Sequence, residues 1–345
     1  MSNVEQSQES CVLHLKILVQ ELKQFSPPKK SDPLSAGFDI GGTNIRGLAL
    51  GNDGELTELH QRRHFGDLKS IVDSIVEISM QIETTTNKKI RNIGIGCAGL
   101  VDSNGVVKTS PNIQAIENFP LRTDVEEKMQ IPVVVENDAN CAAWAEAKLG
   151  AAQGRNNAIV VSFGTGIGAG ILLNGELQKG ASGYAGEIGH MVIEKEGLPC
   201  PCGKRGCWEQ YASGSALGRI ANEMLNEKTI TKMKTNTDFQ NTLITSEQIG
   251  IAAQENHPEA IRVIKAYSEQ VAIGLGNLTK ALDPEVIILG GAITAIGEPL
   301  LQPIKKSYAE IAASESDSAN VEILLARFGN KAGSIGAAIF ANQIL

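Results

Sequence analysis

The first part of the chain has the apolar spacing of strands followed by a helix. Residues 37–40 and 45–50 are predicted strands on either side of a Gly-Gly-Thr turn, and a third strand is expected to end near Phe65. The next apolar residues recur at helical spacing: Ile71, Ile75, Ile78 and Ile82. This order predicts three short strands and then an amphipathic helix.

The alternation of strands and helices continues to residue 150. Residues 93–97 and 132–135 are apolar runs of strand length, and Thr123 with Glu126 has the pattern of a capping box for a short helix between them. The second of these strands ends in the sequence Glu-Asn-Asp. A helix over 139–149 follows, and a glycine stops it.

The second half of the chain begins with the same order of elements. A strand over 158–163 leads into a Gly-Thr-Gly turn, and a strand over 170–173 leads into an Asn-Gly hairpin turn. With one residue of slip, residues 41–56 are echoed by residues 164–177. The echo predicts a duplicated unit with one phosphate-facing turn in each copy.

Helices dominate the predicted remainder of the chain. They are expected at 215–227, about 246–254 and 258–281, with strands at 286–289 and 321–325, a polar surface insertion at 228–245 and a closing helix at 332–345. Residues 1–35 form an extension with helical spacing that two prolines interrupt. The extension is either a docked helix or a partly ordered tail.

With 42% apolar residues, the 345-residue chain can build a substantial core, as two domains or one large one.

Charge and hydrophobic patterning argue against two classes of partner. A net charge of −8 without any basic run argues against nucleic acid. No apolar stretch reaches the length of a membrane span, and the early apolar segment at 11–19 lacks the basic flank of a signal peptide. We therefore expect a cytoplasmic protein with no membrane partner.

A compact group of metal ligands is the strongest local signal. His190, Cys200, Cys202 and Cys207 follow the pattern C-x-C-x4-C with a histidine ten residues upstream. Three thiolates and one imidazole form a closed tetrahedral set for structural Zn²⁺. A redox pair is a weaker interpretation, because the segment lacks C-x-x-C.

Three glycine-rich turns, each after an apolar strand, predict a nucleotide site. The candidate residues are Asp39, Gly41, Gly42, Thr43, Gly164, Thr165, Gly166, Gly290 and Gly291. Glycine lets backbone N–H groups approach a phosphate closely, and Asp39 can hold Mg²⁺ directly or through water. Any one of these turns alone is compatible with an ordinary hairpin, but their recurrence favours a bound nucleotide.

One of these turns also fits the G-x-G-x-x-A pattern of dinucleotide-binding enzymes, over residues 164–169. That pattern requires a helix next, with an acidic residue about 20 positions later. Here the glycines lead into a strand and a hairpin. The sequence context therefore argues against a dehydrogenase.

The end of the strand at 132–135 offers a candidate general base. Asp138 follows Glu136 and Asn137 where an apolar strand gives way to a helix. A carboxylate there can take a proton from a bound hydroxyl, but it can equally cap the helix. The spacing leaves both roles open.

Polar residues beside the metal ligands are candidates for binding sugar hydroxyls. Glu187 and Glu209 flank the metal ligands along the chain, and His190 is itself one of those ligands. These side chains could instead support the metal ligands or face the surface, and the sequence leaves both interpretations open.

Together these motifs resemble the ROK family (repressor, open reading frame, kinase), and the resemblance covers roughly residues 36–345. It rests on Asp-Ile-Gly-Gly-Thr-Asn-Ile-Arg from Asp39, Glu-Asn-Asp-Ala-Asn from Glu136, Gly-Thr-Gly-Ile-Gly from Gly164, Gly-Glu-Ile-Gly-His ending at His190, and Cys-Pro-Cys-Gly-Lys-Arg-Gly-Cys from Cys200. The sequence Cys-Trp-Glu-Gln-Tyr-Ala-Ser-Gly from Cys207 is most similar to bacterial ROK glucokinases.

The resemblance implies an α/β, actin/hexokinase-like (ribonuclease H-like) ATPase fold with two lobes around a nucleotide and sugar cleft. We expect an N-terminal lobe over 36–145, a C-terminal lobe with the zinc knuckle over 146–330, and a closing helix over 331–345. Homo-oligomers are common for such enzymes.

The resemblance also implies an ATP-dependent transfer to the 6-hydroxyl of a hexose, with glucose expected first. Asp138 would be the catalytic base. The implied sugar contacts are Asn112, Asn137, Asp138, Glu187, His190 and Glu209. The turns after Asp39 and at 164–166 would contact phosphates, and Gly290 and Gly291 the adenosine.

Two departures from the glucokinase pattern concern loops that border the sugar. The sequence Cys-Ala-Gly at 97–99 stands where glucokinases often carry Gly-x-Pro-Gly, and the segment at 110–114 lacks the usual Gly-Trp. Parts of the chain also resemble N-acetylmannosamine kinases. N-acetylmannosamine, N-acetylglucosamine and fructose therefore stay open as substrates.

A sugar-responsive repressor is the alternative from another class. The resemblance implies that family repressors carry a DNA-binding helix-turn-helix of roughly 60–80 residues before this body. Only 35 residues precede it here, without a basic recognition helix. The sequence favours the kinase.

Overall fold

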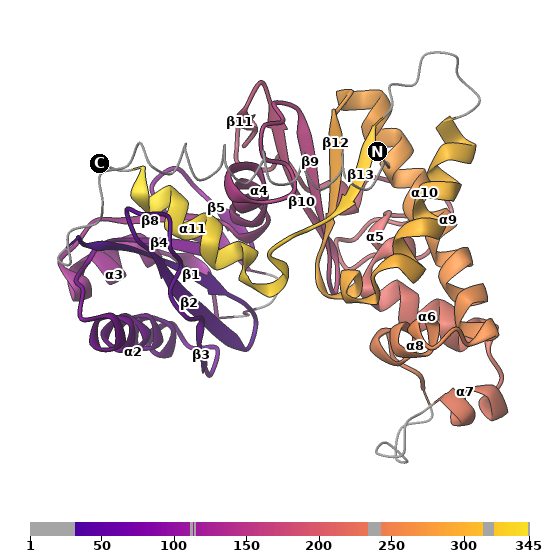
Figure 1. Ribbon diagram of the computed structural model, residues 1–345, viewed down its shortest axis with the longest axis horizontal. Coiled ribbons are helices and arrows are strands. Elements are labelled where there is room, and N and C mark those ends of the chain that lie inside the picture. The colour runs from indigo at the N-terminus through magenta and orange to yellow at the C-terminus, as the bar shows by residue number, and fades with distance from the viewer. Residues whose placement is uncertain (1–31, 111–112, 114, 234–242, 313–320, 344–345) are drawn as a thin grey trace, which may run out of the picture.

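The computed structural model describes residues 32–110, 113, 115–233, 243–312 and 321–343 (Figure 1). The predicted helix within the N-terminal extension lies outside the described residues. The body begins at Leu34, the first residue of β1, two residues before the predicted start of the first lobe.

The first half of the chain forms a five-stranded sheet in the order β3-β2-β1-β4-β8. Its strands are β1 (Leu34–Ile40), β2 (Asn44–Leu50), β3 (His60–Arg63), β4 (Ile90–Cys97) and β8 (Val133–Asn137). Strands β1 and β2 are antiparallel, whereas β1, β4 and β8 are parallel. Three further short strands make a separate sheet: β5 (Leu100–Val101), β6 (Val107–Thr109) and β7 (Glu117–Phe119).

The second half forms another five-stranded sheet, in the order β11-β10-β9-β12-β13. Its strands are β9 (Ala158–Phe163), β10 (Ile167–Leu173), β11 (Glu176–Leu177), β12 (Val286–Gly290) and β13 (Glu322–Leu325). Strands β9 and β10 are antiparallel, and β9, β12 and β13 are parallel. The two sheets therefore repeat one topology, which confirms the duplication predicted from the sequence echo.

Helices cover the two sheets and connect their strands. They are α2 (Leu68–Thr86), α3 (Leu121–Met129), α4 (Asp138–Leu149), α5 (Glu209–Ala212), α6 (Gly214–Met224), α7 (Glu227–Met233), α8 (Ser246–Gln254), α9 (Pro258–Leu282), α10 (Glu298–Ala312) and α11 (Ala332–Asn342). The four isoleucines predicted to line one face of α2 are all fully buried. Each such burial stabilises the fold by roughly 1.5–3 kcal/mol.

Helices α4 and α11 join the two halves. Helix α4 packs on β9 and β10 of the second sheet as well as on β4 and β8 of the first. Helix α11 ends the described chain, but it packs on β1, β4 and α4 (Figure 1). A side chain at Gly336 would collide with the carbonyl of Cys141 at 1.7 Å, so the two helices touch backbone to backbone.

Two local predictions are wrong. Helix α3 begins at Leu121, so Thr123 lies inside it and caps nothing. Pro120 occupies the cap position without a side-chain bond. The buried side chain of Leu121 accounts for the earlier start, because it joins the helix to the core. The prediction of a surface insertion over 228–245 is wrong for its first part, because α7 occupies that part and buries Ile230 and Met233.

Among the described residues, no helix is long and apolar enough to cross a membrane.

Candidate active site

Asp138 is the first residue of α4 and follows directly on β8. Asn137, rather than Asp138, caps this helix, because its Oδ1 accepts a hydrogen bond from the N–H of Asn140 at 3.1 Å. The Asn137 Nδ2 donates to the carbonyl of Gly99 at 3.1 Å. Capping therefore does not explain Asp138, and its carboxylate stays available for chemistry.

Burial raises the pKa of Asp138 above its ordinary range. The N–H of Ala139 opposes this increase, and the negative charge of Glu187 adds to it. Glu187 thus lies close enough to Asp138 to be felt electrostatically. A base whose pKa is raised toward neutrality is a better proton acceptor than an ordinary aspartate.

Asp39 lies near Asp138 at the carboxyl edge of the first sheet. Asp39 pairs with Gly96 of β4, which in turn pairs with Glu136 of β8, so the three parallel strands end together. Burial raises the pKa of Asp39 to about 7, the charge of Asp138 adds to this, and Arg46 opposes it. Arg46 Nη1 lies 3.6 Å from Asp39 Oδ2. The predicted Mg²⁺ ligand and the predicted base are therefore electrostatic neighbours.

A salt bridge connects the two halves at this edge. The nearly buried carboxylate of Glu136 pairs with Lys179, which follows β11 of the second half. Glu136 also accepts from the N–H of Asn137 at 2.9 Å and from Asn140 Nδ2 at 3.0 Å. Glu136 therefore holds the strand-to-helix junction that presents Asp138.

The four predicted metal ligands lie together. One donor atom each from His190, Cys200, Cys202 and Cys207 falls within 4.8 Å of the others. Cys202 Sγ lies 3.6 Å from Cys207 Sγ, and Cys200 Sγ lies 3.6 Å from His190 Nδ1. Ligands about 2.3 Å from a tetrahedral Zn²⁺ are about 3.8 Å apart. The donor set and its spacing fit zinc.

A small hairpin brings these ligands together. Isolated bridges join Val192 to Cys207 and Pro199 to Arg205. The Cys200 N–H donates to the carbonyl of Lys204 at 2.8 Å, which closes the tight turn between the thiols. Residues 17 positions apart in the chain are thereby brought to one point.

One ring nitrogen of His190 is directed at the other three candidate metal ligands, and the other ring nitrogen is directed at Glu187. Its Nδ1 is directed at Cys200, whereas its Nε2 lies 3.9 Å from Glu187 Oε2. Glu209 Oε1 lies 3.7 Å from His190 Nδ1, and Cys200 Sγ donates to the same oxygen at 3.4 Å. Glu187, His190 and Glu209, which are predicted to bind sugar hydroxyls, therefore all lie at or beside the candidate metal site.

Glu209 also touches the second glycine-rich turn. Its Oε2 accepts from the N–H of Ile167 at 3.3 Å. A side chain at Gly166 would lie 2.5 Å from the same oxygen, so it would displace the end of the Glu209 side chain. The turn is fixed on its other side, because Gly164 accepts from the N–H of Gly214 at 2.8 Å.

The third glycine pair lies beside this turn. Gly290 pairs with Ser162 near the end of β9. Gly291 has a left-handed backbone, with φ of 89°, and a side chain there would meet the Phe163 carbonyl at 2.2 Å. Residues 164–166 and 290–291 therefore form one region, and residues 41–43 occupy the matching β1–β2 turn of the other sheet.

Three further findings concern the candidate residues. Asn112 lies outside the described residues. We predicted no contact for Arg46 or Lys179, because a single basic residue in a strand or loop belongs to no recognisable sequence pattern. It also missed His64, which is buried beside the first turn.

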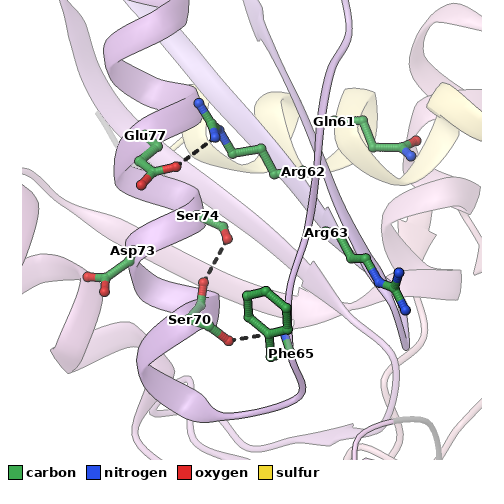
Figure 2. Close-up of a pocket in the computed structure, with 8 residues that line it drawn as sticks. All are labelled: Gln61, Arg62, Arg63, Phe65, Ser70, Asp73, Ser74 and Glu77. Atoms are coloured by element: carbon green, nitrogen blue, oxygen red, sulfur yellow. Dashed lines mark hydrogen bonds and ion pairs between the residues drawn. The ribbon is translucent and has the colours of Figure 1, made fainter.

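A surface pocket of about 480 Å³ lies between β3 and α2 (Figure 2). Arg62 pairs with Glu77 across it at 2.8 Å, and the ring of Phe65 lies exposed at its side. None of the predicted site residues lines this pocket. It is separate from the carboxylates and the metal group.

Comparison with known proteins identifies relatives over nearly the whole chain. The sequence pattern of the ROK family matches residues 35–344. A glucokinase of Streptomyces coelicolor is 36% identical over 313 residues, which is 90% of this chain and 98% of that protein. A xylose repressor of Bacillus subtilis is 30% identical over 307 residues, covering 88% of this chain and 75% of the repressor.

A solved structure shows the same fold. It is a ROK family glucokinase from Streptomyces griseus in complex with glucose and AMPPNP. The two chains are 35% identical, and the match covers 90% of this chain and 99% of the other with a TM-score of 0.81.

Proposed function

Because this chain belongs to the ROK family, we propose that it is an ATP-dependent hexose kinase that phosphorylates the 6-hydroxyl of glucose. The observation that carries the proposal is the continuous set of polar groups from the metal hairpin to the base. It runs from Cys200 through His190 and Glu187 to Asp138. The glucokinase relatives of similar length support glucose as the substrate.

Asp138 is the base in this mechanism. Its raised pKa suits it to accept the proton of the attacking hydroxyl, after which that oxygen forms a bond to the γ-phosphorus and ADP leaves. Glu136 and Asn140 hold the junction that presents Asp138. Much of the rate enhancement of a kinase comes from such positioning.

Glu187, His190 and Glu209 bind the sugar hydroxyls. They offer two carboxylates and one imidazole: Glu187 and His190 lie at the short 3-10 helix before the hairpin, and Glu209 begins the helix after it. Glu209 also contacts the turn at 164–166, so the sugar site and a phosphate turn share one side chain. This sharing supports a reaction between the two bound substrates.

Two metals complete the proposal. Zinc would be held by His190, Cys200, Cys202 and Cys207 and would link the hairpin to the 3-10 helix that carries Glu187 and His190. Burial raises the pKa of the Cys200 thiol to about 12, so that sulfur needs a bound cation to become a thiolate ligand. Magnesium, held near Asp39, would neutralise phosphate charge.

We also propose that the enzyme works in the cytoplasm as a homo-oligomer. The family resemblance supports this oligomeric state, because homo-oligomers are common for such enzymes. Light scattering of the purified protein tests this. A mass equal to one chain at micromolar concentration contradicts it.

A substrate panel tests the proposed function. ADP release is measured with Mg-ATP and glucose, mannose, fructose, N-acetylglucosamine or N-acetylmannosamine. We expect the highest kcat/KM for glucose. A higher value for an N-acetyl sugar or fructose would keep the kinase and change the substrate. Folded, zinc-loaded protein that turns over none of these sugars would contradict the kinase, and a sugar-binding regulator would replace it.

A further inference from the structure

His64 is a buried histidine to which the mechanism assigns no role. It follows β3 directly and is only 3% exposed. Its neighbours Arg63 and Phe65 both line the surface pocket (Figure 2). The contact of its ring with the Gly41 carbonyl shows that the side chain of His64 is directed at the turn between β1 and β2.

Three hydrogen bonds attach His64 to its surroundings. Its backbone N–H donates to the carbonyl of Thr43 at 3.1 Å. Its Nε2 lies 2.7 Å from the carbonyl of Gly41, and its Nδ1 accepts from the N–H of Gly66 at 3.1 Å. The first two bonds hold both ends of the turn at residues 41–43.

The Gly66 bond determines which ring nitrogen of His64 carries the hydrogen. Gly66 N–H can only donate, so Nδ1 must be the unprotonated nitrogen. Nε2 therefore carries the hydrogen and donates it to the Gly41 carbonyl. His64 is a neutral donor fixed toward one peptide group.

That peptide group is the one whose orientation matters for phosphate. The Gly41 carbonyl and the Gly42 N–H belong to the same planar trans peptide and point in opposite directions. A peptide between two glycines rotates at little steric cost, so sequence alone does not fix it. By holding the carbonyl, His64 keeps the Gly42 N–H directed away from β3, toward the exposed side of the turn.

We infer that His64 is a positioning residue for the nucleotide: it presents the Gly42 N–H to an ATP phosphate. The inference rests on the proposed kinase function. Its role is confined to the first turn, since the second turn is held by Glu209 and Gly214. Loss of His64 should weaken nucleotide binding and leave glucose binding intact.

The experiment compares His64→Ala, His64→Gln and His257→Ala with the unmodified enzyme. Glutamine keeps a side-chain N–H donor. His257 is the matched control, because its Nδ1 also accepts a backbone N–H, from Glu259 at 3.3 Å, but at the start of α9. The readouts are KM for ATP, KM for glucose, Kd for a nonhydrolysable ATP analogue and Tm.

We expect His64→Ala to raise KM for ATP and Kd for the analogue about tenfold, the effect of one well-placed hydrogen bond. KM for glucose should change less than twofold. His64→Gln should recover most of the nucleotide affinity, and His257→Ala should alter neither KM.

Equal losses for both substrates in His64→Ala, or unchanged nucleotide affinity, would overturn the inference. So would a His64→Gln variant as weak as His64→Ala at the same Tm. An unmodified enzyme that phosphorylates no sugar would instead contradict the proposed function. Analogue Kd values would still test the positioning role in that case.

Discussion

The two halves of the molecule share a strand order but differ in the side chains at their turns. Strands β1 and β9 each end one residue before a glycine-rich turn, yet the penultimate residue is Asp39 in β1 and Ser162 in β9. The first half continues from β8 into Asp138, whereas the second half has no carboxylate directly after β13. In the proposed mechanism, both copies of the duplicated fold supply a phosphate-binding turn, and only the first copy supplies a general base.

The halves also differ in how each turn is supported. In the first half, the residue after β3, His64, binds the turn directly. In the second half, a metal hairpin follows β11, and Glu209 after that hairpin contacts the turn. The same place in the topology thus carries a single side chain, His64, in one copy and an insertion with the four candidate metal ligands in the other.

The largest effect on kcat is expected when a substitution removes the proposed base from the first half. Asp138→Asn should lower kcat by about 10³-fold, because general-base catalysis contributes about 10²–10⁴. Asp124→Asn is the matched control, since Asp124 is also an acidic residue in the first turn of a helix in this half. Steady-state ADP release measures both. A kcat within tenfold of the unmodified enzyme for Asp138→Asn would remove the base assignment.

The next largest effect is expected when a substitution removes a proposed zinc ligand from the second half. Cys200→Ser should lose bound zinc and reduce kcat/KM for glucose about 100-fold, because His190 and Glu209 lose their fixed positions. Cys141→Ala, a buried thiol outside the metal group, should keep one zinc per chain. Metal analysis and kinetics on the same samples decide this. Full activity without zinc would show that the hairpin needs no metal.

The pH dependence of the free energy of unfolding should depend on Asp39 of β1 but not on Ser162, which occupies the matching position of β9. The pKa of Asp39 is about 7 in the folded chain against 3.8 ordinarily, so the folded state binds its proton more tightly. The free energy of unfolding should therefore fall as pH rises from about 4 to about 7, by up to about 4 kcal/mol.

Asp39→Asn should remove part of this slope and be more stable than the unmodified protein at pH 8. Ser162→Ala, at the matching position of β9, should leave the slope unchanged. Urea unfolding at several pH values measures the difference. Parallel stability curves for Asp39→Asn and the unmodified chain would contradict the raised pKa.

The smallest effect compares two glycines of one turn. Gly166→Ala places a methyl group against Glu209 and should raise KM for glucose about tenfold, since small displacements of a binding group are costly. At Gly164 a side chain would meet no atom within 4 Å, so Gly164→Ala should leave KM for glucose unchanged. Similar glucose KM values for the two variants would mean that Gly166 does not control Glu209.

Much of this site could be predicted because its residues are grouped in sequence. The four metal ligands span residues 190–207, and strand periodicity located the turns and Asp138. What could not be predicted includes which residue caps each helix, as well as contacts with distant partners. Asn137 rather than Asp138 caps α4, and the cap expected at Thr123 lies inside α3.

The buried Glu146 shows the same limit of sequence reasoning. It accepts from the N–H groups of Arg327 and Phe328, more than 180 residues away, and thereby ties α4 to the segment between β13 and α11. Nothing in the spacing of α4 distinguishes this carboxylate from an exposed one. His64 escaped prediction for the same reason, since its partner Gly41 lies 23 residues away, in the turn between β1 and β2.

The division of labour between the two halves is tested most directly by substrate binding to Asp138→Asn. Calorimetry gives Kd for glucose and for a nonhydrolysable ATP analogue. If Asp138 serves mainly as the base, both values should stay within about fivefold of the unmodified enzyme, because the second half and the turns still bind, while turnover is lost. A loss of glucose binding as large as the loss of kcat would contradict this account and make Asp138 a binding residue instead.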